Sequence, residues 1–180
     1  MGQQLNIILI GFMGTGKSSV GRKLARKLNK EFIDTDQEIE QLIGLNITQI
    51  FKKYGEVRFR SEEKLMIEKI ASKRNCVIST GGGTVLDPDN VAILKNNGIL
   101  ICLTASPATV LSRVGKNNNR PMLKNKSSLE LISSLIDERK PYYKCADFSV
   151  DTSDLDIDEI VEKIFLFLDE RGLLNAEVNG

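Results

Sequence analysis

Histidine is absent from this 180-residue sequence. Its ordinary pKa suits proton transfer near neutral pH, and it is the commonest protein ligand for metals, so its absence excludes both uses. Cysteine and carboxylate side chains are left as the metal ligands to look for. Cysteine is also scarce: the sequence has three cysteines and no C-x-x-C pair, and Cys76 and Cys102 stand in or beside apolar runs. This pattern is typical of reduced, buried thiols, and we expect a cytoplasmic protein.

Neither sign of charge is in large excess, since 25 Lys and Arg against 24 Asp and Glu give a formal net charge of +1. We therefore expect no nucleic-acid and no membrane partner, and any anion must be bound by a local cluster of basic residues. No run approaches the roughly 20 apolar residues that span a bilayer. The start of the sequence lacks the Ser or Thr at position 6 of a myristoylation signal and the basic region of a signal peptide.

Short apolar runs alternate with longer stretches of helical period, which predicts a three-layer α/β/α fold around a five-stranded parallel sheet. The predicted strands are residues 5–10, 32–33, 76–79, 98–103 and 148–150. Helices are predicted over 16–28 and, in pieces with breaks near Gly44 and Gly55, over 36–73. Further helices are predicted from Pro88 to about residue 97 and from Pro107 onward. Another helix is predicted to end at Pro141, and the last covers 157–168. We expect one domain over residues 1–172 and a frayed tail at 173–180.

One glycine-rich motif carries a specific chemistry. Residues 11–18 read Gly-Phe-Met-Gly-Thr-Gly-Lys-Ser, which fits G-x-x-x-x-G-K-[ST] between an apolar strand and a helix. Backbone N–H groups of such a loop surround phosphate oxygens, and the helix presents its positive end to the same anion. The motif predicts nucleotide binding without defining the reaction, and the alternative is a turn that merely joins strand to helix. The expected ATP-binding residues of this loop are Gly14, Thr15, Gly16, Lys17, Ser18 and Ser19.

Two aspartates, Asp34 and Asp36, follow the second predicted strand. Residues two apart in an extended chain point the same way, so both carboxylates are expected to face the phosphate loop. One would position Mg²⁺ through water, and the other would accept a proton from an attacking hydroxyl. The alternative for an Asp-Thr-Asp sequence is a helix cap or a solvated turn.

Three arginines and a run of three glycines are further candidates. Arg60, Arg120 and Arg139 suit a carboxylate or phosphate because guanidinium groups bind these anions with two parallel hydrogen bonds. Glu63, one turn after Arg60, is placed to orient it through a salt bridge. Gly81–Gly83 follow the third predicted strand at its carboxyl end, where ligands bind in open α/β sheets. The alternatives are solvated surface arginines and a flexible loop.

Taken together, these motifs resemble those of the shikimate kinase family. The loop Gly11–Arg22 is similar to that family's nucleotide loop, and Phe32–Asp36 to its F-x-D-x-D. The segment 50–63 resembles its I-F…G-E-x-x-F-R-x-x-E, and the order is completed by Gly81–Gly83, Arg120-Pro121 and Glu138-Arg139 through Tyr142. The likeness covers about residues 5–151. It departs at Met122, where the family usually has leucine, and at Arg58, which has no assigned role.

The resemblance implies a P-loop kinase of the nucleoside monophosphate kinase-like fold. We expect the protein to be a monomer. The implied reaction is ATP-dependent phosphorylation of the 3-hydroxyl of shikimate to shikimate 3-phosphate plus ADP, a step of chorismate and aromatic amino-acid biosynthesis. ATP would be the co-substrate, and one Mg²⁺ would bind with it. A shikimate-binding segment would cover about residues 34–63, and a lid about residues 114–126.

The resemblance also implies roles for single residues. Shikimate would be held by Asp36, Arg60, Gly81, Gly82, Gly83 and Arg139. Among these, Asp36 would act as base, and Arg60 and Arg139 would grip the carboxylate. Phe51 and Phe59 would flank the ring, although core packing accounts equally well for both. Lys17 and Arg120 would stabilise the transferring phosphate, Arg113 would lie against adenine, and Ser18 with Asp34 (via water) would hold Mg²⁺.

Two other functions share part of this pattern. A kinase for gluconate or a nucleoside monophosphate would use the same phosphate loop and lid, but it would not need the spaced arginines and the three glycines. A nucleotide switch reads guanine with N-K-x-D after a strand, whereas residues 125–128 read Asn-Lys-Ser-Ser and follow no strand.

Overall fold

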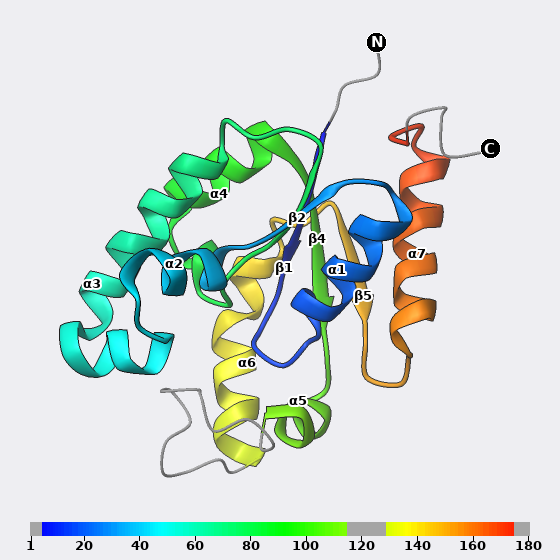
Figure 1. Ribbon diagram of the computed structural model, residues 1–180. Coiled ribbons are helices and arrows are strands. Elements are labelled where there is room, and N and C mark those ends of the chain that lie inside the picture. The colour runs from blue at the N-terminus through cyan, green and yellow to red at the C-terminus, as the bar shows by residue number, and fades with distance from the viewer. Residues whose placement is uncertain (1–4, 115–128, 175–180) are drawn as a thin grey trace.

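The computed structural model describes residues 5–114 and 129–174, and these form a parallel sheet flanked by helices (Figure 1). The strand order is β2-β3-β1-β4-β5, and every pair of neighbours is parallel. The strands are β1 (Asn6–Ile10), β2 (Glu31–Asp34), β3 (Cys76–Ser79), β4 (Gly98–Thr104) and β5 (Phe148–Asp151). The predicted five-stranded parallel sheet is confirmed, and each strand begins and ends within one residue of its predicted range.

The helices also follow the predicted order. They are α1 (Lys17–Lys27), α2 (Thr35–Ile43), α3 (Ile47–Ile70), α4 (Pro88–Asn97), α5 (Pro107–Val114), α6 (Leu129–Tyr143) and α7 (Ile157–Glu170), with a 3-10 turn at Thr84–Leu86. The predicted breaks are confirmed: α2 ends before Gly44, and Gly55 interrupts α3 with φ 80° and ψ 173°. The helix expected to close at Pro141 extends to Tyr143, which places that residue one turn beyond Arg139.

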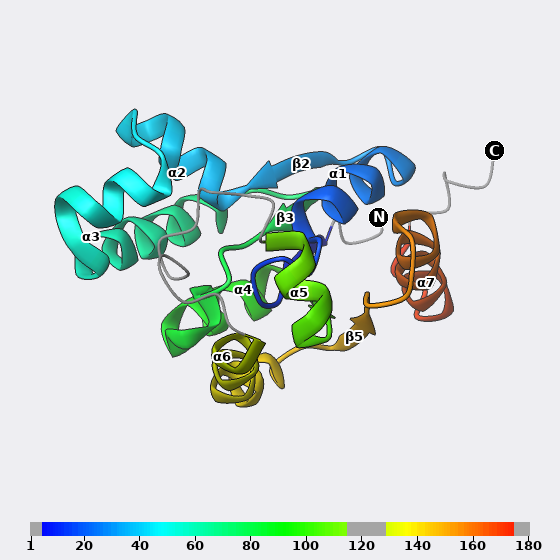
Figure 2. The same ribbon diagram turned by 90° about the horizontal axis from the view of Figure 1, so that it is seen from below.

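The strand residues divide between two cores because successive side chains point to opposite faces of a sheet. Ile7 and Leu9 of β1 pack in the cluster that contains Leu24 of α1 and Ile164 of α7. Ile8 and Ile10 pack in the other cluster, with residues of α3 and α4 such as Ile67 and Leu94. The views of Figures 1 and 2 show these helices on opposite sides of the sheet, so the three-layer arrangement is confirmed.

The topology sets the position of the site. The chain leaves β1, passes over β3 to form β2, returns to β3 and then continues to β4 on the other side of β1. Ligands in open α/β sheets bind at the carboxyl ends of the strands where the order reverses in this way. Residues that follow β1, β2 and β3 therefore converge at one edge of the sheet.

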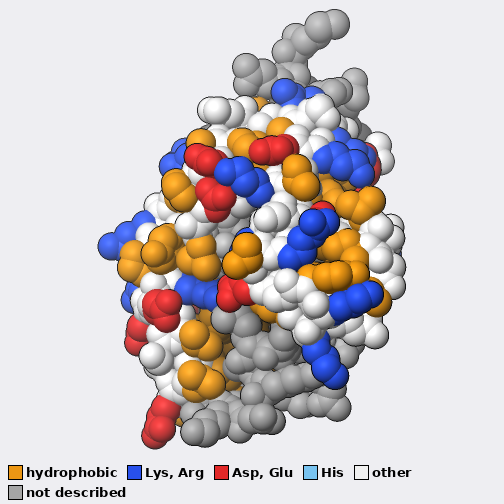
Figure 3. Space-filling view, turned by 90° about the vertical axis from the view of Figure 1, so that its left-hand side faces the viewer, with side chains coloured by type: hydrophobic (Ala, Val, Ile, Leu, Met, Phe, Trp, Pro, Cys, Tyr) orange, Lys and Arg blue, Asp and Glu red, His pale blue; other side chains and the backbone are white. Residues whose placement is uncertain are grey.

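The outer face formed by α2 and α3 mixes hydrophobic side chains with side chains of both charges (Figure 3). Its exposed apolar side chains are Leu42, Tyr54, Val57 and Leu65. Within residues 5–114 and 129–174, no helix combines the length and the apolar character needed to cross a membrane.

Candidate active site

The loop between β1 and α1 has the conformation that binds phosphate. Gly11, Gly14 and Gly16 all have positive φ, of 140°, 76° and 96°. A Cβ on Gly11 would overlap the backbone carbonyl of Leu103 on the neighbouring strand, so glycine is required there. The loop is closed internally by Thr15, whose hydroxyl donates a 2.8 Å hydrogen bond to the carbonyl of Phe12. The N-terminus of α1 follows at once and points its N–H groups into this turn.

Lys17, the first residue of α1, is buried in this loop. Its ammonium donates hydrogen bonds to the carbonyls of Gly11 (2.8 Å) and Phe12 (2.9 Å). These bonds keep the charge inside the turn, which is where the sequence motif predicts that a lysine meets phosphate oxygens.

Asp34, at the end of β2, connects the loop to α2. Its Oδ1 accepts hydrogen bonds from the backbone N–H groups of Asp36 (3.2 Å) and Gln37 (3.3 Å), so it is the N-cap of α2. Its Oδ2 accepts a 2.6 Å hydrogen bond from the hydroxyl of Ser18. The hydroxyl of Ser79, the last residue of β3, lies 3.5 Å from that of Ser18. Asp34 is thus both the cap of α2 and a neighbour of the phosphate loop. Its predicted orientation toward the loop and the alternative of a helix cap are both confirmed for this residue.

Asp36 lies in a different direction from Asp34, toward the three glycines. The expectation that both carboxylates face the phosphate loop assumed extended backbone, but α2 begins at Thr35, so Asp36 is already helical. A Cβ placed on Gly81 would lie 2.8 Å from Asp36 Oδ1 and 2.5 Å from Glu63 Oε1. The N–H of Gly81 donates to the hydroxyl of Thr35 at 3.2 Å. The start of α2 is therefore packed directly on the glycine run.

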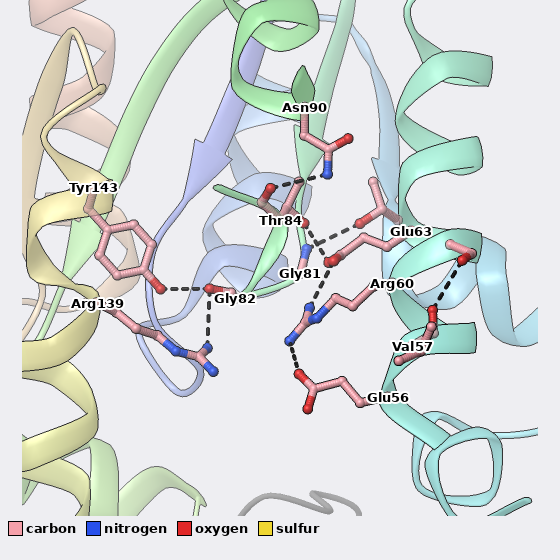
Figure 4. Close-up of polar contacts among 12 residues, drawn as sticks. Glu56, Val57, Arg60, Glu63, Gly81, Gly82, Thr84, Asn90, Arg139 and Tyr143 are labelled. Atoms are coloured by element: carbon pink, nitrogen blue, oxygen red, sulfur yellow. Dashed lines mark hydrogen bonds and ion pairs between the residues drawn. The ribbon is translucent and has the colours of Figure 1, made fainter. Parts of the chain in front are cut away.

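Arg60 is held in place on α3 by two carboxylates (Figure 4). Its guanidinium donates to Glu63 Oε2 at 2.8 Å and to Glu56 Oε1 at 3.2 Å. Although burial disfavours the charged form, the attraction and hydrogen bonds of Glu63, followed by those of Glu56, raise the pKa of Arg60. The salt bridge between Arg60 and Glu63 predicted from their spacing is confirmed.

Glu63 itself is only 1% exposed. Its Oε1 accepts a 2.7 Å hydrogen bond from the hydroxyl of Thr84, and Asn90 Nδ2 donates to the carbonyl of Thr84 at 3.2 Å (Figure 4). A buried carboxylate is tolerated when charged and polar donors surround it, as here. Arg60 is therefore anchored through Glu63 to the segment that follows the glycines.

Arg139 approaches the glycine run from the opposite side, on α6 (Figure 4). It is buried, its guanidinium lies over the ring of Phe12 at 5.7 Å, and its Nη1 donates to the carbonyl of Gly82 at 3.5 Å. The hydroxyl of Tyr143 donates to the same carbonyl at 2.7 Å. Arg60 and Arg139, which the resemblance assigns to one carboxylate, thus lie on either side of Gly82.

Arg113 borders the nucleotide loop from the last turn of α5. Its guanidinium donates to the carbonyl of Thr152 (2.7 Å), to the hydroxyl of Thr152 (2.9 Å) and, at 3.4 Å, to the carbonyl of Gly14. Its predicted place beside the nucleotide is consistent with these contacts. Arg120 lies outside the described residues, as does the lid from residue 115 onward.

Three further residues of α3 have partners within the structure. The rings of Phe51 and Phe59 pack at 4.7 Å between centroids, Phe59 in the core and Phe51 against it, as the core-packing interpretation expects, and their flanking of a substrate ring stays a prediction. Arg58 pairs with Glu62 one turn along α3, which gives this extra charge a partner.

Sequence reasoning did not single out Ser79, Thr84, Tyr143 or Thr152. Ser79 and Thr84 flank the glycine run at the end of β3, and this position was the signal that could have found them. Tyr143 stands four residues after Arg139 and so shares a face of α6 with it. No comparable signal in the sequence indicates Thr152.

Comparison with known proteins agrees with this arrangement. The family model described as shikimate kinase matches residues 13–169. A shikimate kinase of Pelotomaculum thermopropionicum is 52% identical over 169 residues, which are 94% of this chain and 98% of that protein. A shikimate kinase of Desulforudis audaxviator is 49% identical and matches over 95% of this chain and 90% of its own length.

Solved structures give the same result. The shikimate kinase of Acinetobacter baumannii, determined in complex with shikimate, superposes with a TM-score of 0.90 at 35% identity. That match covers 94% of this chain and 95% of the other. Family model, sequence identity and fold all agree over nearly the whole length, and the chain belongs to the shikimate kinase family.

Proposed function

We propose that this protein transfers the γ-phosphoryl group of ATP to the 3-hydroxyl of shikimate, giving shikimate 3-phosphate and ADP. The observation that carries the proposal is the position of Gly82 between a phosphate-binding loop and two arginines. A small ring that bears both a carboxylate and a hydroxyl needs cationic groups for one and a proton acceptor for the other. The names of the curated relatives, and the shikimate bound in the Acinetobacter structure, support shikimate as that acceptor.

On the nucleotide side, the loop N–H groups and Lys17 would bind the β- and γ-phosphates of ATP, and Arg113 would lie against adenine. Ser18 Oγ and Asp34 Oδ2 are adjacent hard oxygens beside the loop, and they suit Mg²⁺, which takes few protein ligands alongside phosphate and water. When bound there, Mg²⁺ would neutralise charge on the β- and γ-phosphates. Ser18 would bind it directly, and Asp34 through water.

On the acceptor side, Arg60 and Arg139 would bind the carboxylate of shikimate from opposite sides of the glycine run. Asp36 would orient the 3-hydroxyl and accept its proton as the phosphoryl group is transferred. Phosphoryl transfer asks mainly for positioning and charge neutralisation, so these few groups suffice. The shikimate-binding segment would cover residues 34–63, and a lid at 114–126 carrying Arg120 would exclude water.

The test is ADP release from MgATP with shikimate, gluconate and AMP offered separately. Acceleration by shikimate alone supports the proposal. Acceleration by gluconate or AMP would retain a kinase but contradict the assignment of the acceptor site. If ATP binds and no acceptor accelerates ADP release, a nucleotide switch becomes the better account.

A further inference from the structure

The carbonyl of Gly82 receives two hydrogen bonds from one face of α6. Tyr143 donates its hydroxyl at 2.7 Å, whereas Arg139, one turn earlier, donates Nη1 at the much longer distance of 3.5 Å (Figure 4). The tyrosine is therefore the main donor to this carbonyl. None of the roles in the proposed function is given to Tyr143.

Gly82 is the point of contact between the two halves of the site. A Cβ on it would lie 3.3 Å from the backbone N of Met13 and 3.5 Å from the carbonyl oxygen of Gly11, both in the nucleotide loop. On the other side, a Cβ on Gly83 would overlap the guanidinium of Arg60. The peptide that joins Gly82 to Gly83 thus lies between the nucleotide loop and Arg60, one of the two arginines proposed to bind the carboxylate of shikimate.

We propose that Tyr143 is a positioning residue for shikimate, acting through the Gly82–Gly83 peptide. A trans peptide is planar, so its N–H points opposite to its carbonyl. With the Gly82 carbonyl fixed toward α6, the N–H of Gly83 points away from Tyr143. Arg60 and Glu63 lie on that opposite side of the glycine run (Figure 4). This inference rests on the proposed function, because shikimate is taken to be the molecule that accepts a hydrogen bond from this N–H.

The hydroxyl of Tyr143 also helps to place Arg139, since the charge and a side-chain hydrogen bond of Arg139 act on that hydroxyl. If the hydroxyl were absent, Arg139 would lose this neighbour and become the main donor to the Gly82 carbonyl. Burial raises the pKa of Tyr143, so the hydroxyl keeps its proton and remains a donor at neutral pH. Loss of the tyrosine hydroxyl would thus disturb both the plane of the Gly82–Gly83 peptide and the position of Arg139.

The experiment compares Tyr143→Phe with Tyr142→Phe. Both changes remove a hydroxyl from a tyrosine near the end of α6, but Tyr142 is 48% exposed. We expect Tyr143→Phe to raise the KM for shikimate by roughly three- to tenfold, the loss of one hydrogen bond, while the Kd for ATP stays unchanged. Tyr142→Phe should match the wild type in both quantities. Melting temperatures measured in parallel report any change in stability.

The outcomes separate the two proposals. A rise in KM for shikimate without a change in ATP affinity supports positioning, because a loss of stability alone would not divide the two substrates. A Tyr143→Phe variant that kept the wild-type KM, whatever its melting temperature, would overturn the inference, as would equal weakening of both substrates. If the wild type itself showed no shikimate-dependent ADP release, the proposed function would fail first, and separately.

Discussion

The hydroxyl of Ser18, at the start of α1, donates a 2.6 Å hydrogen bond to Asp34 Oδ2 at the end of β2. The other oxygen of Asp34 caps α2. One carboxylate therefore connects the phosphate loop to the helix that carries Asp36. Under the proposed function its two oxygens would have separable roles, one in holding Mg²⁺ through water and one in capping α2.

Substitutions of Asp34 should separate these roles. Asparagine is as good an N-cap as aspartate, so Asp34→Asn should leave the melting temperature nearly unchanged. Without the negative charge, the Mg²⁺ concentration for half-maximal activity should rise about tenfold. Asp34→Ala should also lower the free energy of unfolding by about 1 kcal/mol. Magnesium titrations of activity and denaturant unfolding measure the two effects.

Asp156 provides the control for that experiment, because it caps α7 with a 2.9 Å bond to the N–H of Glu159. Asp156→Asn should change neither stability nor the magnesium requirement. An unchanged magnesium requirement in Asp34→Asn would remove this residue from the proposed metal site.

Asp36 should matter for turnover and little for nucleotide binding. We expect Asp36→Asn to lower kcat by about 100-fold or more, the usual contribution of a positioned proton acceptor, and to leave the Kd for ATP unchanged. Steady-state kinetics and a direct ATP titration give the two numbers. Parallel losses in both would instead assign Asp36 a structural role at the start of α2.

Gly83→Ala should weaken shikimate binding through Arg60. The added Cβ would overlap the guanidinium of Arg60, whereas the backbone of Gly83, with φ −102°, is open to any residue. We expect the KM for shikimate to rise about tenfold or more as Arg60 is displaced, with ATP affinity unchanged. Gly172→Ala, beyond α7 where a Cβ meets no atom within 4 Å but φ is +63°, should lower stability and leave the KM unchanged. A Gly83→Ala variant with the wild-type KM would show that Arg60 can be displaced without weakening shikimate binding.

The cysteines should react slowly or not at all in the folded protein. Burial raises the pKa of all three thiols, that of Cys102 to about 11. A raised pKa leaves little of the reactive thiolate at pH 8. We therefore expect Cys76 and Cys102 to resist a thiol reagent until the chain unfolds, and Cys145, which is half-buried, to react slowly. Mass spectrometry of labelled peptides locates the modified residues, and rapid labelling of Cys102 in folded protein would contradict the packing.

Much of the fold was predictable because its signals are local. The five strands are short apolar runs, and Asp87-Pro88 marks the start of α4 by cap and proline, as predicted. The glycine-rich loop carries its meaning in eight consecutive residues, and the pair Arg60 and Glu63 lies within one helical turn. In each case the residues that act together stand close to one another in the sequence.

The remaining features depend on contacts between distant segments. Tyr143 donates to a carbonyl 61 residues away, and nothing in the sequence near a tyrosine indicates such a partner. The direction of Asp36 depended on where α2 begins, and a shift of one or two residues at a helix start redirects a side chain. Position within the sheet, which decides that Ser79 lies beside Ser18, follows from the crossover between β1 and β2.

The most direct test of the proposed function is the identity of the product. The protein should be incubated with MgATP and shikimate, and the product examined by two-dimensional ¹H–³¹P NMR. We predict one new phosphate monoester whose phosphorus couples to the ring proton at carbon 3, formed in equal amount to ADP. Phosphate attached at another hydroxyl, or appearing only as inorganic phosphate while ADP accumulates, would contradict the assignment of Asp36 and the two arginines to the acceptor.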